Sequence, residues 1–258
     1  MGKNKLKKFG EMAELDFVFQ YPFGVLKEQG FPYKGKWHSE VFGNENPIVL
    51  ELGCGKGEYT TGLARRFANR NYIGVDIKGA RMWTGAKEAE REGLKNVAFL
   101  RTDIELLPEF FAPGEVAEIW ITFCDPQMKK TRKRLTSTRF MGLYRKVMKD
   151  GGRVNLKSDS PFLYTYTKRM VEKNSLPLLH DTADLYGSAG GELPEGLREI
   201  RTHYENQWLQ RGLSIKYLAW ELPHDGGLEE PEEDDIEQDT YRSYSRGYIQ
   251  GVVTEETE

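Results

Sequence analysis

Short apolar runs alternate with amphipathic stretches along the first half of this chain. Branched and aromatic residues gather at 47–52, 71–76 and 96–103, and the first of these runs leads directly into glycines. Such runs are typical of buried parallel strands that enter tight turns. Residues 57–69 and 78–92, which lie between them, carry apolar side chains at helical spacing. This alternation predicts strand–helix–strand units and a largely parallel sheet.

The same alternation continues to residue 222. Further strands are expected at 115–126, 153–159, 176–185 and 213–222, and further helices at 138–149, 160–174 and 201–211. Helices that connect parallel strands cover both faces of the sheet, so the predicted fold class is a doubly wound α/β sheet. In such sheets a ligand lies beyond the carboxyl ends of the strands, where the strand order reverses.

The two ends of the chain depart from this pattern. Residues 1–46 mix basic, aromatic and glycine residues, and we expect an extension that packs loosely or closes over a site. Residues 224–258 are acidic and poor in apolar side chains, a composition that indicates disorder. The chain is therefore divided into an N-terminal extension (1–46), a main domain (47–223) and an acidic tail (224–258).

The net charge of −3 hides an uneven distribution. The chain has 37 basic and 40 acidic residues, of which the tail, residues 224–258, holds 2 and 12. Residues 1–223 therefore carry 35 basic and 28 acidic residues, a net charge of +7. A basic body suits a polyanionic partner such as a nucleic acid, although an ordinary solvated surface can have the same composition.

Composition also argues against several classes of protein. No apolar run approaches the roughly 20 residues that span a bilayer, and the basic N-terminus has no apolar stretch behind it, so neither a membrane span nor a secretory signal is expected. Cys54 and Cys124 do not suggest a disulfide framework, which favours a reducing cytoplasm. The four histidines show no metal-ligand spacing, and we predict no metal.

A glycine-rich sequence, E-L-G-C-G-K-G, begins at Glu51 where the first strand of the main domain should turn into a helix. Gly53, Gly55 and Gly57 allow the backbone to turn sharply and to approach a ligand closely. A dinucleotide fingerprint would need its third glycine at position 58, but Glu58 stands there, a poor neighbour for a pyrophosphate. Glu51 instead suits a cationic ligand with a free amino group. S-adenosylmethionine has both a sulfonium and an α-amino group.

Two further acids follow the next two strands. Asp76 ends the second strand, where a carboxylate can accept hydrogen bonds from ribose hydroxyls. Asp103 ends the third strand, where an acceptor can meet the adenine amino group. The alternative is an ordinary glycine turn with three solvated acids. Acids at three successive strand ends favour a site for S-adenosylmethionine over that alternative.

A second stretch of chemical interest, F-C-D-P-Q-M-K-K-T-R-K-R, follows the fourth strand. Asp125 and Pro126 come directly after the strand, where methyltransferases that modify nitrogen often carry an acid that reads the substrate. Beside an active-site mouth, the cations that follow would bind phosphates and release counterions. This position favours contact with nucleic acid over a merely solvated loop. The cations are Lys129, Lys130, Arg132, Lys133 and Arg134.

In these motifs, and in their order, the sequence resembles the bacterial tRNA (guanine-N7)-methyltransferases. The resemblance runs from about residue 47 to residue 222. Besides the two stretches above, it rests on G-V-D at 74–76, K-S-D at 157–159 and T-H-Y-E at 202–205. It implies the class I methyltransferase fold, a Rossmann-like, mostly parallel sheet with an antiparallel last strand. It also implies S-adenosylmethionine as cofactor and, as target, N7 of a guanine in the tRNA variable loop, commonly position 46.

The resemblance also assigns roles to single residues. Glu51, Asp76 and Asp103 would contact the cofactor together with the three loop glycines, and Asp125 would be catalytic while also lying at the cofactor site. The substrate-binding positions would be Lys129, Asp159, Thr202, His203, Tyr204 and Glu205. Residues 131–136 match a stretch implicated in contacting RNA. The candidates for RNA contact are Arg132, Lys133 and Arg134 in this stretch and Lys130 directly before it.

The chain departs from the family pattern in the loop after the fourth strand. The family usually shows F-P-D-P-W, whereas this chain has Cys124 and Gln127 in place of the proline and the tryptophan. An aromatic contact near the target base is therefore in question. Ser158 stands where threonine is usual, a mild change.

Two other functions remain open. One is a class I methyltransferase that acts on a small molecule or a protein, with an incidental basic loop. The other is an RNA-binding relative without turnover. We expect tRNA as partner, and the chain as a monomer or a homodimer.

Overall fold

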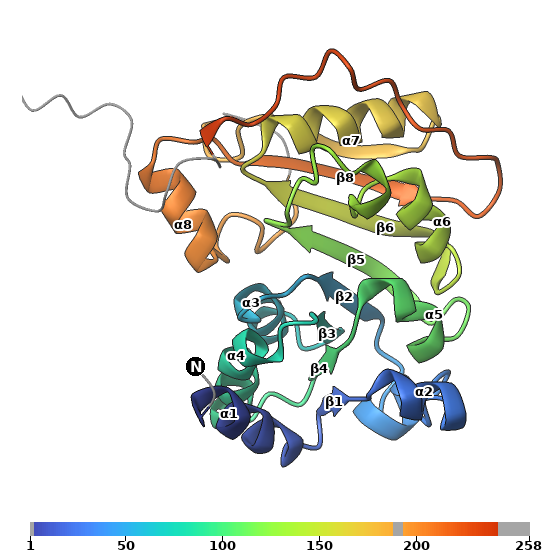
Figure 1. The fold of residues 1–258 in the computed structure, drawn as a ribbon, viewed down its shortest axis with the longest axis vertical. Coiled ribbons are helices and arrows are strands. Elements are labelled where there is room, and N and C mark those ends of the chain that lie inside the picture. Colours follow the sequence, from blue (N-terminus) through green and yellow to red (C-terminus); the bar gives the residue numbers. More distant parts are fainter. Residues whose placement is uncertain (1–2, 188–192, 242–258) are drawn as a thin grey trace, which may run out of the picture.

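An eight-stranded sheet runs through the part of the protein that the computed structural model describes, residues 3–187 and 193–241 (Figure 1). The strand order is β1-β4-β3-β2-β5-β6-β8-β7. The strands are β1 (Val18–Gln20), β2 (Ile48–Leu52), β3 (Asn71–Val75), β4 (Val97–Arg101), β5 (Val116–Thr122), β6 (Met148–Ser158), β7 (Leu178–Thr182) and β8 (Lys216–Leu222).

The first six strands in this sheet order are parallel. β8 runs antiparallel to both of its neighbours, β6 and β7. From β2 the chain proceeds to β3 and β4 on one side and then crosses to β5 on the other side of β2. The predicted doubly wound sheet and its antiparallel last strand are confirmed, and the strand order reverses between β2 and β5.

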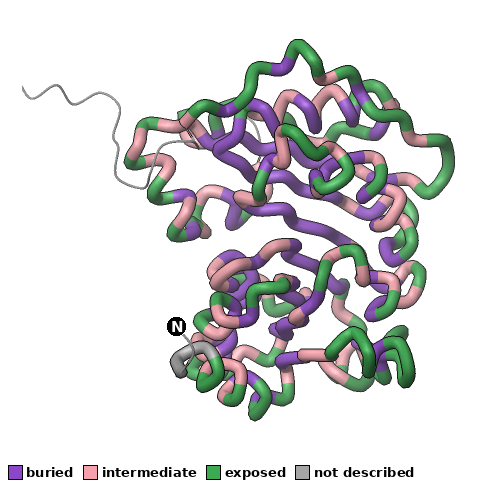
Figure 2. The backbone as a smooth tube through the Cα atoms, in the orientation of Figure 1, coloured by how far each residue is buried: buried purple, intermediate pink, exposed green. Residues whose placement is uncertain are grey.

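Helices cover both faces of the sheet, and the strands between them are buried along most of their length (Figure 2). One face carries α1 (Lys3–Ala13), α3 (Glu58–Arg66), α4 (Gly79–Glu92) and α8 (His203–Gln210). The other carries α2 (Phe23–Gln29), the π-helix Trp37–Phe42, α5 (Leu107–Phe110), α6 (Thr138–Tyr144) and α7 (Pro161–Lys173). Short 3-10 turns cover Ile104–Leu106 and Thr131–Lys133.

Strand register brings the carboxyl ends of the central strands to one edge. Leu52 at the end of β2 pairs with Val75 of β3 and with Ile121 of β5. Thr122, the next residue of β5, pairs with Lys157 of β6. Residues that follow these four strands therefore meet at the edge where a doubly wound sheet places its ligand.

The N-terminal segment packs closely, and the expectation of a loosely packed extension is wrong for its described part. β1 adds a parallel strand to the edge of the sheet beside β4. Trp37 is fully buried and donates through Nε1 to the carbonyl of Phe110 at 2.9 Å. The carboxylate of Glu115 accepts from the backbone N–H of Gly35 and of Trp37, at 2.9 and 3.1 Å. The rings of this segment bury large apolar area, which holds it against the β4 and α5 side of the sheet.

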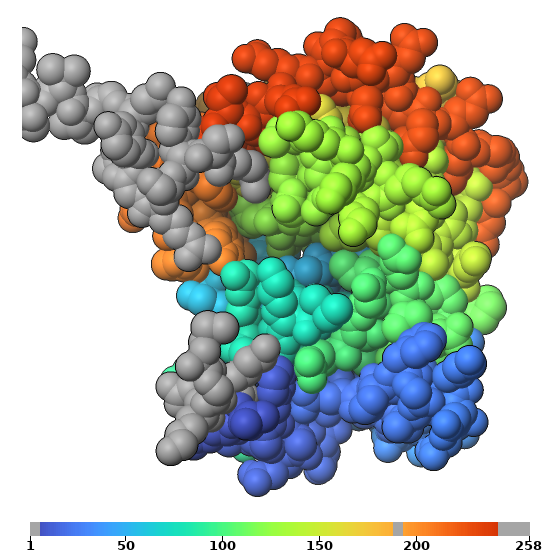
Figure 3. All heavy atoms as spheres, in the orientation of Figure 1, coloured from blue at the N-terminus to red at the C-terminus, as the bar shows by residue number. Residues whose placement is uncertain are grey.

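The acidic tail is also ordered over its described part, residues 224–241, so the expectation of disorder is wrong there; residues 242–258 lie outside the described residues. We call residues 229–241 the strap. It runs over α6 and α7 (Figure 3). Ile236, which is 9% exposed, packs with Phe162 and Tyr166 of α7.

Acidic side chains of the strap accept hydrogen bonds from N–H groups and arginines of the main domain. Two of them lie at helix N-termini, where a carboxylate is stabilised by the unpaired N–H groups: Glu230 accepts from the N–H of Thr138, and Asp239 accepts from the N–H of Phe162. Two others pair with arginines, Glu233 with Arg134 and Asp235 with Arg169. A composition poor in apolar residues is therefore compatible with order here, because the charges have fixed partners.

Candidate functional site

A cavity of about 610 Å³ lies at the carboxyl ends of β2, β3 and β5. Its walls come from residues that follow these three strands, from the basic loop after β5, and from the start of α8. Its volume falls in the range of small-molecule and cofactor sites. The cavity thus lies where the reversal of strand order predicts a ligand.

The glycine loop forms one wall of this cavity. Gly53, Gly55 and Gly57 have φ angles of +74°, +56° and +74°, a left-handed backbone that favours glycine. A Cβ atom on Gly53 would meet nothing within 4 Å, whereas one on Gly57 would lie 2.7 Å from the ring of Phe99. Gly53 therefore leaves backbone open toward the cavity, and Gly57 packs against the sheet.

Two acids predicted at the strand ends support this loop. Asp76 accepts from the N–H of Gly55 at 2.9 Å and from that of Lys78 at 2.7 Å, which fixes its carboxylate at the cavity wall. Glu51 is 3% exposed and accepts from the N–H of Thr60 at 2.8 Å and from the hydroxyl of Thr122 at 2.6 Å. Burial raises the pKa of Glu51 to about 7, although these hydrogen bonds lower it.

Asp103 does not line the cavity. It is exposed, and its carboxylate accepts from the N–H of Glu105 at 3.0 Å as the cap of the following 3-10 turn. The next residue, Ile104, lines the cavity instead. The contact between Asp103 and the cofactor stays a prediction.

Asp125 lies on the cavity wall in a strained loop after β5. The non-glycine residues Phe123 and Gln127 on either side have φ angles of +49° and +50°, a conformation that costs about 1–3 kcal/mol each when the structure enforces it. Asp125 accepts from the N–H of Gln127 at 2.9 Å and is exposed. The loop therefore presents a carboxylate across the cavity from the glycine loop.

The basic run divides into exposed and buried cations. Lys129, Lys130, Arg132 and Lys133 are exposed, and Lys133 lines the cavity. Arg134 is fully buried, so this structure does not present its side chain to RNA, and its RNA contact stays a prediction. The physical reason lies in its contacts, since it pairs with Glu233 of the strap, donates to carbonyls of the loop and lies 3.9 Å from the ring centroid of Tyr166.

Asp159 directly follows β6 and is fully buried, away from the cavity walls. It accepts from the hydroxyl of Tyr241, in the strap, at 2.6 Å. Its neighbour Lys157 is equally buried and donates to Glu205 at 2.8 Å and to the carbonyl of Leu197 at 2.7 Å. Burial lowers the pKa of Lys157, although the adjacent carboxylate raises it.

The T-H-Y-E segment begins α8 as a capping box. Thr202 accepts from the N–H of Glu205 at 3.1 Å, and Glu205 accepts in return from the N–H of Thr202. Thr202 and Tyr204 line the cavity, while His203 is exposed and Glu205 is fully buried against Lys157. Both partners of the buried pair are enclosed, so Glu205 does not reach the cavity in this structure, and its contact with a substrate stays a prediction.

Some residues of the site were not predicted from the sequence. Glu58 accepts from the N–H of His203 at 3.0 Å and so ties the start of α3 to the start of α8. Trp208 lines the cavity, and a role for it had no sequence signal beyond its position after the T-H-Y-E segment. Thr122 lines the cavity beside Glu51. The capping box, in contrast, is a local pattern that the sequence displays.

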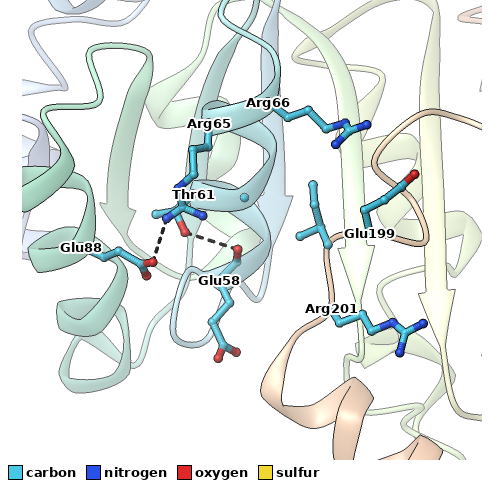
Figure 4. Close-up of a pocket in the computed structure, with 9 residues that line it drawn as sticks. Glu58, Thr61, Arg65, Arg66, Glu88, Glu199 and Arg201 are labelled. Carbon is cyan, nitrogen blue, oxygen red and sulfur yellow. Dashed lines mark hydrogen bonds and ion pairs between the residues drawn. The ribbon is translucent and has the colours of Figure 1, made fainter.

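A second cavity, of about 560 Å³, lies between α3, α4 and the segment before α8 (Figure 4). Its charged side chains are balanced in sign: Glu58, Glu88 and Glu199 face it together with Arg65, Arg66 and Arg201. Arg65 pairs with Glu88 at 2.8 Å. Balanced and paired charges make this cavity a poorer anion site than the exposed cations beside Asp125.

Two features are absent from the residues that the structure describes. In that part of the chain, no helix combines the length and the apolar character that crossing a bilayer requires. No cluster of three or more histidine, cysteine or acidic side chains there is arranged to hold a metal ion. Cys54 is buried and Cys124 is half-buried, and no disulfide joins them.

Solved structures of low sequence identity share this fold. The 16S rRNA methyltransferase KamB superposes with a TM-score of 0.54 at 15% identity, over 72% of this chain and 92% of that one. A structure described as an antibiotic-related methyltransferase gives a TM-score of 0.51 at 17% identity, over 71% and 90%. These likenesses show the fold and nothing about the substrate.

Sequence comparison is more specific. The family model described as "Putative methyltransferase" matches residues 45–218. The tRNA (guanine-N(7)-)-methyltransferase of Bacteroides thetaiotaomicron is 57% identical over 98% of this chain and 99% of its own length. That of Porphyromonas gingivalis is 61% identical over 91% and 96%, and that of Bacillus subtilis is 35% identical over 71% and 84%. The chain therefore belongs to the tRNA (guanine-N(7)-)-methyltransferase family of S-adenosylmethionine-dependent enzymes.

Proposed function

We propose that this protein transfers the methyl group of S-adenosylmethionine to N7 of a guanine in the variable loop of tRNA, commonly position 46. The observation that carries the proposal is one cavity with two chemically different walls. The glycine loop, Glu51 and Asp76 form the first, and Asp125, Lys133 and the start of α8 form the second. Relatives at 57–61% identity bear the name of this activity.

The first wall fits the cofactor. Glu51 and Asp76 bring two carboxylates to the cavity wall, which suits a ligand that carries an ammonium group and a ribose with two hydroxyls. The backbone of Gly53, open toward the cavity, allows close approach. When bound, S-adenosylmethionine supplies a methyl group on a sulfonium, which makes that carbon electrophilic.

The second wall fits the base. Guanine N7 has a free lone pair and no proton, so the reaction needs alignment and exclusion of water rather than a strong base. The base becomes cationic as the methyl group arrives. Asp125, on the cavity wall, would accept from the N1 and N2 edge of the guanine and offset this charge.

The base must also leave the tertiary structure of the tRNA, at a cost of a few kcal/mol. The exposed cations of the basic loop would offset this cost through phosphate contacts. Four of the five predicted cations are exposed: Lys129, Lys130, Arg132 and Lys133.

Methyl transfer from labelled cofactor into bulk tRNA tests the proposal. Label in tRNA supports it. Label only in protein or small molecules would favour a methyltransferase of another substrate class, and tRNA binding without label would favour an RNA-binding relative without turnover.

Other aspects of the protein stay predictions. They include a cytoplasmic location, which two cysteines outside any disulfide suit, a monomeric or homodimeric state, and the division of the chain at residues 46 and 223. Size-exclusion chromatography with light scattering determines the oligomeric state.

Cofactor affinity is expected to fall as the pH drops below 7. The pKa of Glu51 in the free protein is about 7, so the carboxyl is protonated below that pH and must lose its proton to bind a cationic ligand. The dissociation constant should therefore rise by up to about tenfold per pH unit between pH 7 and 5. Calorimetry with S-adenosylmethionine measures it. In Glu51→Gln the dependence should be absent, and an unchanged slope in this variant would assign it to another group.

The affinity for tRNA should depend less steeply on salt concentration when exposed cations of the basic loop are removed. Each of Lys130→Ala and Lys133→Ala is expected to lower the slope of log affinity against log salt concentration by about 1, because one phosphate contact is lost. Lys149→Ala is the matched control, since Lys149 is exposed near the start of β6, at the opposite edge of the sheet. If all three variants kept the slope of the wild-type protein, the basic loop would not contact phosphates.

A further inference from the structure

The acceptor side of the cavity contains an indole ring. Position 127 holds glutamine, and Gln127 lines the cavity with a polar side chain. Trp208, on α8, lines the same cavity. α8 therefore supplies a large aromatic surface to the cavity, in addition to the half-buried ring of Phe123 in the loop after β5.

Two residues in the described part of the chain hold the ring of Trp208 in its orientation. The ring of Tyr241, at the end of the strap, lies edge-to-face with it at 5.5 Å between centroids and 77° between planes. The guanidinium of Arg211 lies over the indole at 4.8 Å from the centroid. Arg211 also donates to the carbonyl of Tyr241 at 3.5 Å, so the three residues form one unit.

Tyr241 is itself anchored. Its hydroxyl donates to Asp159 at 2.6 Å, and Asp159 is fully buried at the end of β6. Two residues earlier, Asp239 accepts from the hydroxyl of Ser160 at 2.5 Å and from the N–H of Phe162 at 3.1 Å. These hydrogen bonds hold the end of the strap against the sheet and the first turn of α7. Because Tyr241 packs against Trp208, they also restrict the movement of the indole ring.

A base taken out of RNA loses its stacking neighbours. An aromatic side chain can replace them, and such stacking contributes substantially to binding of unpaired bases. N7 methylation also gives the base a positive charge, which the face of an indole ring attracts. An indole beside the acceptor site therefore suits both the substrate and the product of the proposed reaction.

We propose that Trp208 is the stacking surface for the target guanine, and that Tyr241 of the strap is the residue that positions it. This inference rests on the proposed function. Tyr204 lines the cavity too, but among the described residues its ring has one aromatic neighbour, the exposed His203 at 5.9 Å. Trp208 has the larger ring and the fixed orientation.

Steady-state kinetics with tRNA tests the stacking role. Trp208→Ala should lower kcat/KM for tRNA about 5- to 100-fold, while Trp208→Phe, which keeps an aromatic face, recovers most of it. Cofactor affinity by calorimetry should stay unchanged in both. The matched control is Trp83→Ala, because Trp83 is also half-buried but lies on α4 and donates to Glu11.

A fluorescence readout does not depend on turnover. Titration with guanosine 5′-monophosphate should quench part of the tryptophan emission of the wild-type protein, and Trp208→Phe should abolish that part. Wild-type efficiency in Trp208→Ala, or quenching that persists in Trp208→Phe, would overturn the stacking role. If the wild-type protein itself transferred no methyl group to tRNA, the proposed function would fail, whereas the quenching would still report on the base site.

The positioning role has its own test. Tyr241→Phe keeps the ring but removes the donor to Asp159. We therefore expect a loss in kcat/KM that is smaller than in Trp208→Ala and that comes from a higher KM for tRNA. If Tyr241 acts through this hydrogen bond, Tyr241→Phe should lower kcat/KM for tRNA much less in an Asp159→Asn background than in the wild-type background. Full additivity of the two changes, or no effect of Tyr241→Phe, would contradict it.

Discussion

The Asp125→Asn variant should transfer methyl groups to tRNA about 10²- to 10³-fold more slowly than the wild-type protein, the loss typical of removing one preorganised electrostatic contact from a developing charge. Asparagine keeps the shape of the side chain and an oxygen that can accept from the N–H of Gln127. The loop should therefore keep its conformation. What disappears is the negative charge that faces the base as it becomes cationic.

Single-turnover rates at saturating cofactor and tRNA measure this effect, because they exclude product release. Asp150→Asn is the matched control, since Asp150 is also exposed and also accepts from a backbone N–H, that of His224 at 2.7 Å, but near the start of β6. Full turnover in Asp125→Asn would show that the carboxylate does not stabilise the transition state.

Replacing Glu205 with glutamine should destabilise the fold by about 3–5 kcal/mol, the usual cost of leaving a buried charge without its partner. Glu205 and Lys157 are both fully buried, 2.8 Å apart. Glu205 also accepts from the hydroxyl of Tyr186 at 2.7 Å. Loss of the carboxylate would therefore loosen the start of α8 and the end of β6 together.

Denaturant unfolding of Glu205→Gln measures the free energy. Glu195→Gln serves as control, because Glu195 pairs with Arg66 at the surface, where 67% of its side chain is exposed, and its loss should hardly change stability. If Glu205→Gln had wild-type stability but a raised KM for tRNA, the result would contradict the structural role and support the substrate-binding role that the sequence motif implies.

Local patterns predicted most of the fold. The apolar runs at β2, β3 and β5 are buried because they are central parallel strands, and their composition shows it directly. The glycine loop and Asp76 were predictable for the same reason, since a strand, a tight turn and an acid at the next strand end are adjacent in sequence and fixed by register. These features depend on few long-range contacts.

The strap and Arg134 were not predictable because their environment is made by residues about a hundred positions apart. Within a run of similar cations nothing marks Arg134 as buried until Glu233 is placed beside it. The tail is poor in apolar residues, so its composition indicated disorder. Its described part is held instead by ion pairs and by hydrogen bonds to helix N-termini. The role of Trp208 was left open by the sequence for a related reason, since its neighbour Tyr241 comes from that same tail.

If one cavity joins a wall for the cofactor to a wall that holds a guanine, the methyl group must arrive at one defined atom of the tRNA. Unmodified tRNA is incubated with the protein and labelled S-adenosylmethionine, digested, and analysed by mass spectrometry of nucleosides and of oligonucleotide fragments, with Asp125→Asn in parallel. We expect 7-methylguanosine at a single site in the variable loop, strongly reduced with the variant. Methylation of another atom, of another base, or of a guanine outside that loop would contradict it.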